Sequence, residues 1–114
     1  MPGTLAALFF KRDANGGLAF LRSAPTYIDA RDLAANTNET HTVPAGAECV
    51  YFSADGDFYA KANGAAAIPG DVTDGSASEI NPKGWYLGDG ITSIGLIAPA
   101  ARKITLSFYK LKNS

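Results

Sequence analysis

The stretch from Val50 to Lys61 decides the fold class: it reads Val-Tyr-Phe-Ser-Ala-Asp-Gly-Asp-Phe-Tyr-Ala-Lys. Larger apolar residues alternate with polar or smaller ones on both sides of Asp55-Gly56, which is typical of strands with one buried face. Asp-Gly is also a turn sequence that joins paired strands. We therefore expect a tight hairpin here, with Phe52 and Phe58 on its buried face.

From Thr40 to Lys110 the chain keeps this character. Short alternating stretches are separated by Gly, Pro, Asp and Asn, at the roughly 8–12-residue spacing of sandwiches and barrels. Segments 91–98 and 103–110 are expected to form closing strands. The pattern predicts an all-β fold of antiparallel strands. The expected inner faces carry Val50, Phe52, Phe58, Ile94, Leu96, Ile104, Leu106 and Phe108.

The first 36 residues are expected to form an N-terminal hairpin or arm and a connecting segment. The run Leu5–Phe10 is apolar, Asn15-Gly16 is a turn signal, and 18–22 is apolar again. Residues 30–35 are the best helical candidate, of a turn or two. With 37–114 as the core strands, the 114 residues are expected to form one domain.

The composition is that of an ordinary globular protein. Hydrophobic residues make up 46% of the chain and charged residues 18%, with a formal net charge of -1. Lys and Arg are scattered, so no nucleic acid partner is expected. No apolar stretch approaches the roughly 20 residues that cross a bilayer, and no secretory signal is evident, so we expect a protein made in the cytoplasm without a membrane partner.

Two sets of residues suggest chemistry. The acidic loop Asp71–Glu79, with Asp55 and Asp57 nearby, offers oxygen ligands to calcium, but its spacing departs from the EF-hand loop, and turn capping by Asp and Ser explains the same residues. His41 and Cys49 are a formal nucleophile pair, but the thiol lies in an apolar strand without a third orienting group. We therefore expect no metal, no cofactor and no enzyme activity.

Most aromatic residues occur as adjacent pairs. Neighbours in a strand point to opposite faces, so each pair places one ring in the core and one outside. Outward Tyr51, Tyr59 and Tyr109 are expected to form a stripe, which is either a solvated cross-strand pairing or a surface that a partner covers. The run from Leu5 is either a core strand or a sheet edge that a partner strand joins. The expected partner interface is Leu5, Leu8, Phe9, Phe10, Tyr51, Tyr59, Trp85 and Tyr109.

Four segments, His41–Ala47, Phe52–Ala60, Ile68–Pro82 and Ile94–Ala101, resemble a group of small virion structural proteins of tailed bacteriophages. Within that group the chain is most similar to capsid decoration (cement) proteins. The resemblance implies a β-sandwich of jelly-roll-like form on the outer capsid surface. It also implies that the chain binds and stabilises the major capsid protein as a homo-oligomer, a dimer or trimer, without enzyme activity.

Two alternatives stay open. The same resemblance fits a component of the tail or of the head-tail junction. A carbohydrate- or receptor-binding β-sandwich module is the other alternative, because Tyr51, Tyr59 and Trp85 together with the Asp-rich loops provide rings and polar groups that a glycan uses.

Overall fold

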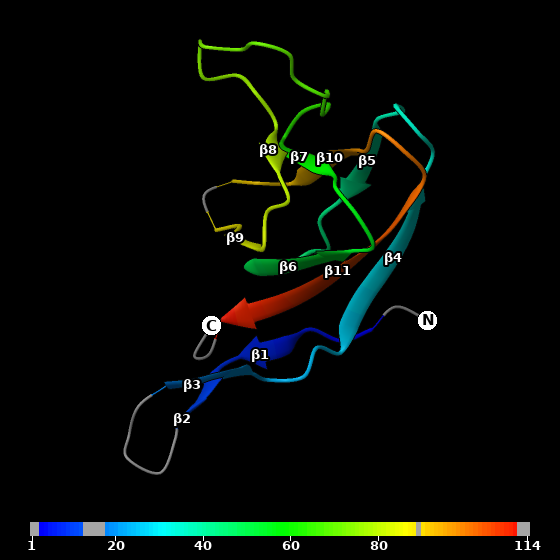
Figure 1. Ribbon diagram of the computed structural model, residues 1–114. Helices are drawn as coiled ribbons and strands as arrows, with labels where there is room; N and C mark the ends of the chain where they lie inside the picture. Colours follow the sequence, from blue (N-terminus) through cyan, green and yellow to red (C-terminus); the bar gives the residue numbers. More distant parts are fainter. Residues whose placement is uncertain (1–2, 13–17, 89, 112–114) are drawn as a thin grey trace.

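The computed structural model describes residues 3–12, 18–88 and 90–111 (Figure 1). The strands are, in chain order, β1 (Ala6–Leu8), β2 (Phe10–Arg12), β3 (Leu18–Arg22), β4 (Tyr27–Leu33), β5 (Glu39–Thr42), β6 (Cys49–Ala54), β7 (Tyr59–Ala62), β8 (Glu79–Ile80), β9 (Gly84–Tyr86), β10 (Ser93–Ile97) and β11 (Arg102–Leu111). The all-β prediction is confirmed. These residues contain no helix, and so none that is long and apolar enough to cross a membrane.

The strands form two sheets that pack against each other and a separate two-stranded ribbon (Figure 1). The main sheet has the order β1-β11-β6-β9, with β4 also paired to β11; the second sheet has the order β5-β10-β7-β8; and the ribbon consists of β2 and β3. Strand β6 occupies one edge of β11, whereas β4 and β1 occupy successive stretches of the other edge. All pairs are antiparallel except β1 with β11, so the expectation of a wholly antiparallel fold is wrong at β1.

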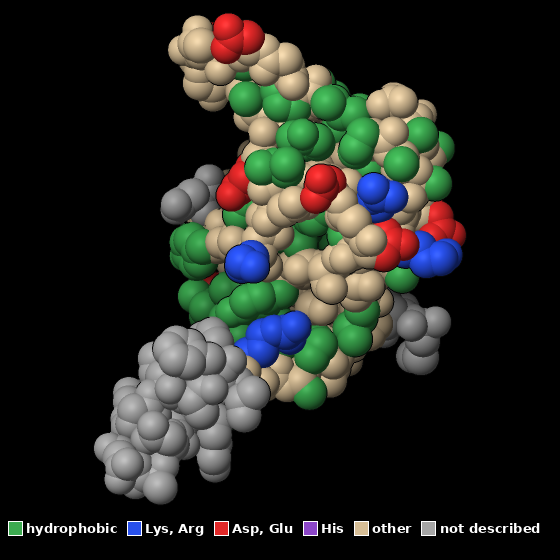
Figure 2. All heavy atoms as spheres, viewed as in Figure 1, with side chains coloured by type: hydrophobic (Ala, Val, Ile, Leu, Met, Phe, Trp, Pro, Cys, Tyr) green, Lys and Arg blue, Asp and Glu red, His purple; other side chains and the backbone are tan. Residues whose placement is uncertain are grey.

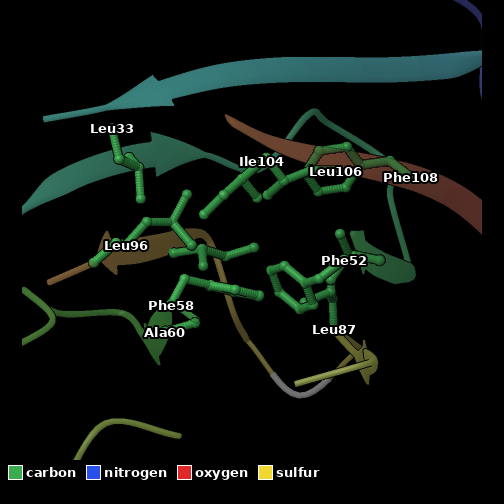
Figure 3. Packing of buried hydrophobic residues seen from close by; sticks show 12 residues of the cluster. Leu33, Phe52, Phe58, Ala60, Leu87, Leu96, Ile104, Leu106 and Phe108 are labelled. Carbon is green, nitrogen blue, oxygen red and sulfur yellow. The ribbon is translucent and has the colours of Figure 1, made fainter. Parts of the chain in front are cut away.

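One hydrophobic core fills the space between the two sheets, as Figure 3 shows. All eight residues expected on the inner faces belong to it, which confirms that prediction. Leu33, Ala60, Leu87 and Ala98 complete the buried cluster. The core therefore joins both sheets into one unit, an arrangement consistent with a β-sandwich.

The hairpin expected at Asp55-Gly56 is wrong. Strand β6 lies in the main sheet and β7 in the second, so the chain crosses from one sheet to the other at this point. Over Cys49–Tyr51 both edges of β6 are occupied, by β11 and by β9, so β7 cannot pair with this stretch. The two apolar faces meet across the core instead, with the rings of Phe52 and Phe58 5.9 Å apart.

The prediction of a helix at residues 30–35 is also wrong, because residues 30–33 belong to strand β4 and residues 34–35 lead into a turn. Along β4 the side chains alternate between exposed and half-buried, and the strand ends on Leu33, which is 2% exposed. Strand β4 pairs with β11 over its whole length. Burial of Leu33 and the backbone pairing with β11 outweigh the helical propensity of the three alanines in this segment.

The N-terminal strands divide between the main sheet and the ribbon. Strands β2 and β3 pair antiparallel, and the Asn15-Gly16 turn signal between them lies outside the described residues. Strand β1 lies near the start of the apolar run Leu5–Phe10 and pairs with β11. The main sheet thus takes two strands, β1 and β4, from the first 36 residues.

Candidate functional site

The outer face of the main sheet, turned away from the core, carries an apolar groove. Paired residues of neighbouring strands lie on the same face, so Cys49, Tyr86 and Tyr109 form one row across this face. The groove has a volume of about 300 Å³, and Figure 2 shows hydrophobic side chains gathered over β6 and β9. We call it the outer groove; it is lined by Leu8, Cys49, Val50, Tyr51, Gly84, Trp85 and Tyr86.

Gly84 lines the groove without a side chain of its own. It pairs with Tyr51 on the outer face, and a Cβ at position 84 would lie 3.2 Å from the Tyr51 ring. Tyr86, two residues further along the same face of β9, is 55% exposed. The absence of a side chain at Gly84 therefore makes room for the Tyr51 ring itself.

Arg22, at the end of the ribbon, stacks on the aromatic rings beside the groove. Its guanidinium carbon lies 4.7 Å from the Tyr51 ring centroid and 5.5 Å from that of Tyr109, within cation-π range. Arg22 Nη1 donates a hydrogen bond to Tyr109 Oη, which donates in turn to the Ser23 carbonyl at 2.6 Å. These contacts fasten the end of β3 to the outer face and orient the Tyr51 ring.

Of the eight expected interface residues, Leu8, Tyr51 and Trp85 line the outer groove, although the ring of Trp85 turns inward and packs against the core. Tyr109 lies on the same face but is 0% exposed, and Tyr59 belongs to the second sheet. The expected stripe of three outward tyrosines is therefore wrong.

The remaining expected residues lie around the N-terminal strand. Leu5 is partly buried against the core, whereas Phe9 is 53% exposed. Phe10 begins β2, and its side chain lies outside the part of the chain that the structure describes. The backbone of this run is already engaged, since β1 pairs with β11 and Ser23 Oγ donates to the Ala7 carbonyl at 2.7 Å.

Sequence reasoning missed Gly84 and Tyr86. The signal for Tyr86 was present, because only one ring of the pair Trp85-Tyr86 is expected to face the core. The structure gives the inner position to Trp85, whose ring lies 5.1 Å from that of Phe52. The exposed ring is therefore that of Tyr86, whereas the predicted interface contained Trp85 and omitted Tyr86.

Cys49 and His41 are not brought together by the fold. Cys49 is 7% exposed, and burial, followed by the negative charge of Glu48, raises the pKa of its thiol, which disfavours the reactive thiolate. His41 lies in the second sheet, and its ring nitrogens contact other partners: Asp29 Oδ2 at 2.7 Å and Arg31 Nη1 at 3.2 Å.

The acidic loop caps its own turn. Asp74 Oδ1 accepts hydrogen bonds from the Ser76 hydroxyl at 2.6 Å and from the Ser76 amide at 3.0 Å, and these bonds lower the pKa of Asp74. This is the turn-capping arrangement of short polar side chains. Within residues 3–12, 18–88 and 90–111, no three His, Cys, Asp or Glu side chains gather closely enough to hold a metal ion.

Comparison of the chain with protein-family models, with curated proteins and with solved structures found no match. The role of the chain is therefore inferred from the outer groove, the sheets that hold it and the segments quoted above.

Proposed function

We propose that this chain is a non-enzymatic structural protein of a tailed-bacteriophage virion, which binds major capsid protein subunits and so decorates and stabilises the capsid. The outer groove is the observation that carries the proposal. A sheet face that turns to solvent is normally polar, whereas this one presents Leu8, Tyr51 and Tyr86 around a hollow. Exposed apolar surface rich in aromatic rings is characteristic of protein interaction sites.

The frame behind the groove supports this role. Strand β6 is paired on both edges, and Val50 and Phe108, which lie opposite each other on its inner face and that of β11, are 0% exposed. A groove on such a frame is preorganised, so binding loses little conformational entropy. A protein that holds capsid subunits together benefits from this rigidity, and the resemblance of four segments to phage virion proteins favours the same role.

The composition of the particle tests the proposal. Mass spectrometry of purified virions of the phage that encodes the chain should find it at a copy number comparable to that of the major capsid protein. Absence of the chain contradicts a virion role. A few copies per particle contradict capsid decoration and favour a tail or head-tail junction component instead.

Binding of the recombinant protein to capsid shells that lack it tests the groove. Tyr86→Ala should weaken co-sedimentation with the shells by about tenfold or more, because aromatic anchors dominate interface energies. Ile80→Ala is the matched control, since Ile80 is 51% exposed but lies in the second sheet. An equal effect of the two substitutions would exclude the groove as the contact.

A carbohydrate- or receptor-binding module is the second candidate, and the exposed ring of Tyr86 favours it. An exposed aromatic ring beside a hollow offers an apolar face on which a ligand can stack. A glycan array separates the two: binding that disappears in Tyr86→Ala supports this candidate, whereas an array without signal dismisses it.

A further inference from the structure

We propose that Asn63 is a site of covalent modification, at which the backbone nitrogen of Gly64 attacks the side-chain amide, and that the hydrogen bonds of the folded protein slow this reaction. The proposal goes beyond the proposed function and does not depend on it. Asn63 directly follows β7, and Gly64 begins the segment that leads to β8. Strand β7 is paired with β10 where this segment begins (Figure 1).

The chemistry follows from the dipeptide Asn63-Gly64. The nitrogen of Gly64 forms a bond to Cγ of Asn63, and Nδ2 leaves as ammonia with the proton that the Gly64 nitrogen loses, so a five-membered succinimide ring forms. Water then opens the ring at either carbonyl and gives aspartate or isoaspartate. Glycine hinders this attack least because it has no Cβ, and asparagine is among the thermolabile residues.

The fold holds both polar atoms of the Asn63 side chain. Its Oδ1 accepts hydrogen bonds from Thr92 N at 2.8 Å, from Thr92 Oγ1 at 3.3 Å and from Ser93 N at 3.3 Å. Its Nδ2 donates to the Gly90 carbonyl at 3.0 Å. The backbone is held as well, because Asn63 N donates to the Ser93 carbonyl at 2.8 Å. Cγ therefore turns toward the Gly64 nitrogen only after these side-chain bonds open.

The junction between Asn63 and β10 lies at the surface. Asn63 is exposed and Gly64 is half-buried, so water and hydroxide reach the reacting atoms once the side chain is released. Local opening of a few hydrogen bonds requires less free energy than global unfolding. The rate of modification should therefore follow the opening of this junction.

Modification removes one of the contacts permanently. Aspartate and isoaspartate both replace the Nδ2–H donor by a carboxylate oxygen, which only accepts hydrogen bonds and so repels the Gly90 carbonyl. Isoaspartate also adds a methylene group to the main chain after β7. Residues 90–92, which lead into β10, thereby lose a tie to the end of β7.

Mass spectrometry of tryptic peptides from protein aged at mildly alkaline pH tests the proposal. The peptide 62–83 should gain the mass of deamidation at Asn63, at least about tenfold more slowly in the folded protein than in guanidinium chloride. Asn81 in the same peptide is the internal control, because the nitrogen of Pro82 carries no hydrogen and cannot attack. Equal rates in the two conditions would show that the fold does not protect Asn63.

The dipeptide Asn15-Gly16, in the tryptic peptide 13–22, calibrates the chemistry in guanidinium chloride. In the unfolded chain Asn15 and Asn63 should be modified at similar rates, because each is followed by glycine. Modification of Asn15 without modification of Asn63 under these conditions would overturn the site.

Gly64→Ala separates the chemistry from the fold. The nearest atom to the added Cβ is Lys61 Cε at 3.7 Å, an ordinary contact, so the folded structure should be unchanged. The added Cβ hinders the attacking nitrogen, and Asn63 should be modified about tenfold more slowly in the unfolded variant. An unchanged rate would contradict attack by the nitrogen of residue 64.

Asn63→Asp reproduces one product and tests the loss of the tie. Asn36→Asp is the matched control: Asn36 is exposed, has a φ of 57° against 55° at Asn63, and its side chain forms no hydrogen bond to a described residue. Asn63→Asp should unfold at a lower concentration of guanidinium chloride than Asn36→Asp, because the bond to Gly90 is lost. Equal midpoints would show that modification does not weaken the junction.

Discussion

His41 Nε2 lies 2.7 Å from Asp29 Oδ2, and this contact joins β5 of the second sheet to β4 of the main sheet. Arg31 Nη1 lies 3.2 Å from His41 Nδ1, and arginine can only donate, so Nδ1 accepts and Nε2 carries the hydrogen that is shared with Asp29. His41 is 8% exposed and stacks on the ring of Phe108, with centroids 5.8 Å apart. The bond is therefore a polar cross-link between the sheets.

We expect Asp29→Ala to lower the free energy of unfolding by about 1–3 kcal/mol, because it leaves the buried Nε2–H of His41 without a partner. Urea denaturation measures the change. Asp32→Ala is the matched control on the same strand, since the Asp32 side chain is 79% exposed and its ion pair with Lys103 is a surface pair. Equal shifts of the two midpoints would show that the cross-link adds no stability.

The alternation of side chains made the strands and the core predictable. Ile104, Leu106 and Phe108 recur with period two, and all three are buried. The alternation does not encode which sheet a strand enters. Asp55-Gly56 suits a hairpin and a crossing between sheets equally well, and only the competition for the edges of β6 decides between them.

The outer groove was only partly predictable, because it combines strands β1, β6 and β9, which are distant in sequence. Tyr51 was expected there because β6 has six residues, enough to show which of them face the core and which face outward. Strand β9 has three residues, too few to indicate whether Trp85 or Tyr86 faces outward. The burial of Tyr109 depends on contacts with Arg22 and Ser23 from the end of the ribbon, which no local pattern reveals.

Cys49 should make the stability of the protein sensitive to alkaline pH. Burial, followed by the charge of Glu48, raises the pKa of its thiol above the ordinary value of 9.0. Between the unfolded and the folded pKa, the folded protein keeps a proton that the unfolded chain loses. This contribution to stability is therefore complete below the unfolded pKa and is lost as pH rises through the folded pKa. The free energy of unfolding should fall from about pH 8 to about pH 10.

Cys49→Ala provides the comparison for this pH dependence. Tyr51, whose pKa is raised chiefly by burial and next by the charge of Cys49, keeps the effect of burial in the variant and loses that of Cys49. The difference between the two pH profiles therefore contains the titration of the thiol and the effect of its charge on Tyr51. Urea denaturation at about pH 8 and about pH 10 should show a smaller fall in the free energy of unfolding for Cys49→Ala than for the unmodified protein. Identical pH profiles of the two proteins would contradict a raised thiol pKa.

Tyr109→Phe should loosen the end of the ribbon. The hydroxyl of this fully buried residue accepts from Arg22 and donates to the Ser23 carbonyl, and its removal leaves both groups unpaired. We expect a loss of about 1–2 kcal/mol in unfolding free energy, with faster tryptic cleavage after Arg22. Tyr86→Phe, which removes the hydroxyl of an exposed ring, is the control. Cleavage that stays equally slow in both variants would mean that the hydroxyl does not hold the ribbon.

Gly95→Ala should disturb the contact between β10 and the loop that follows β7. A Cβ at this buried position would lie 2.2 Å from the Gly64 carbonyl oxygen and 2.7 Å from the Ala66 nitrogen, so the loop rests directly on the strand backbone. Alanine must push the loop outward and strain the hydrogen bond from Ala66 N to Asn38 Oδ1, now 2.7 Å. Overpacking of this kind costs about 1–3 kcal/mol, measurable by urea denaturation and by the shift of the Ala66 amide resonance. Gly70→Ala is the control, because no atom lies within 4 Å of its added Cβ, and it should change neither the stability nor the Ala66 resonance. A Gly95→Ala protein as stable as this control would show that the loop has room to move.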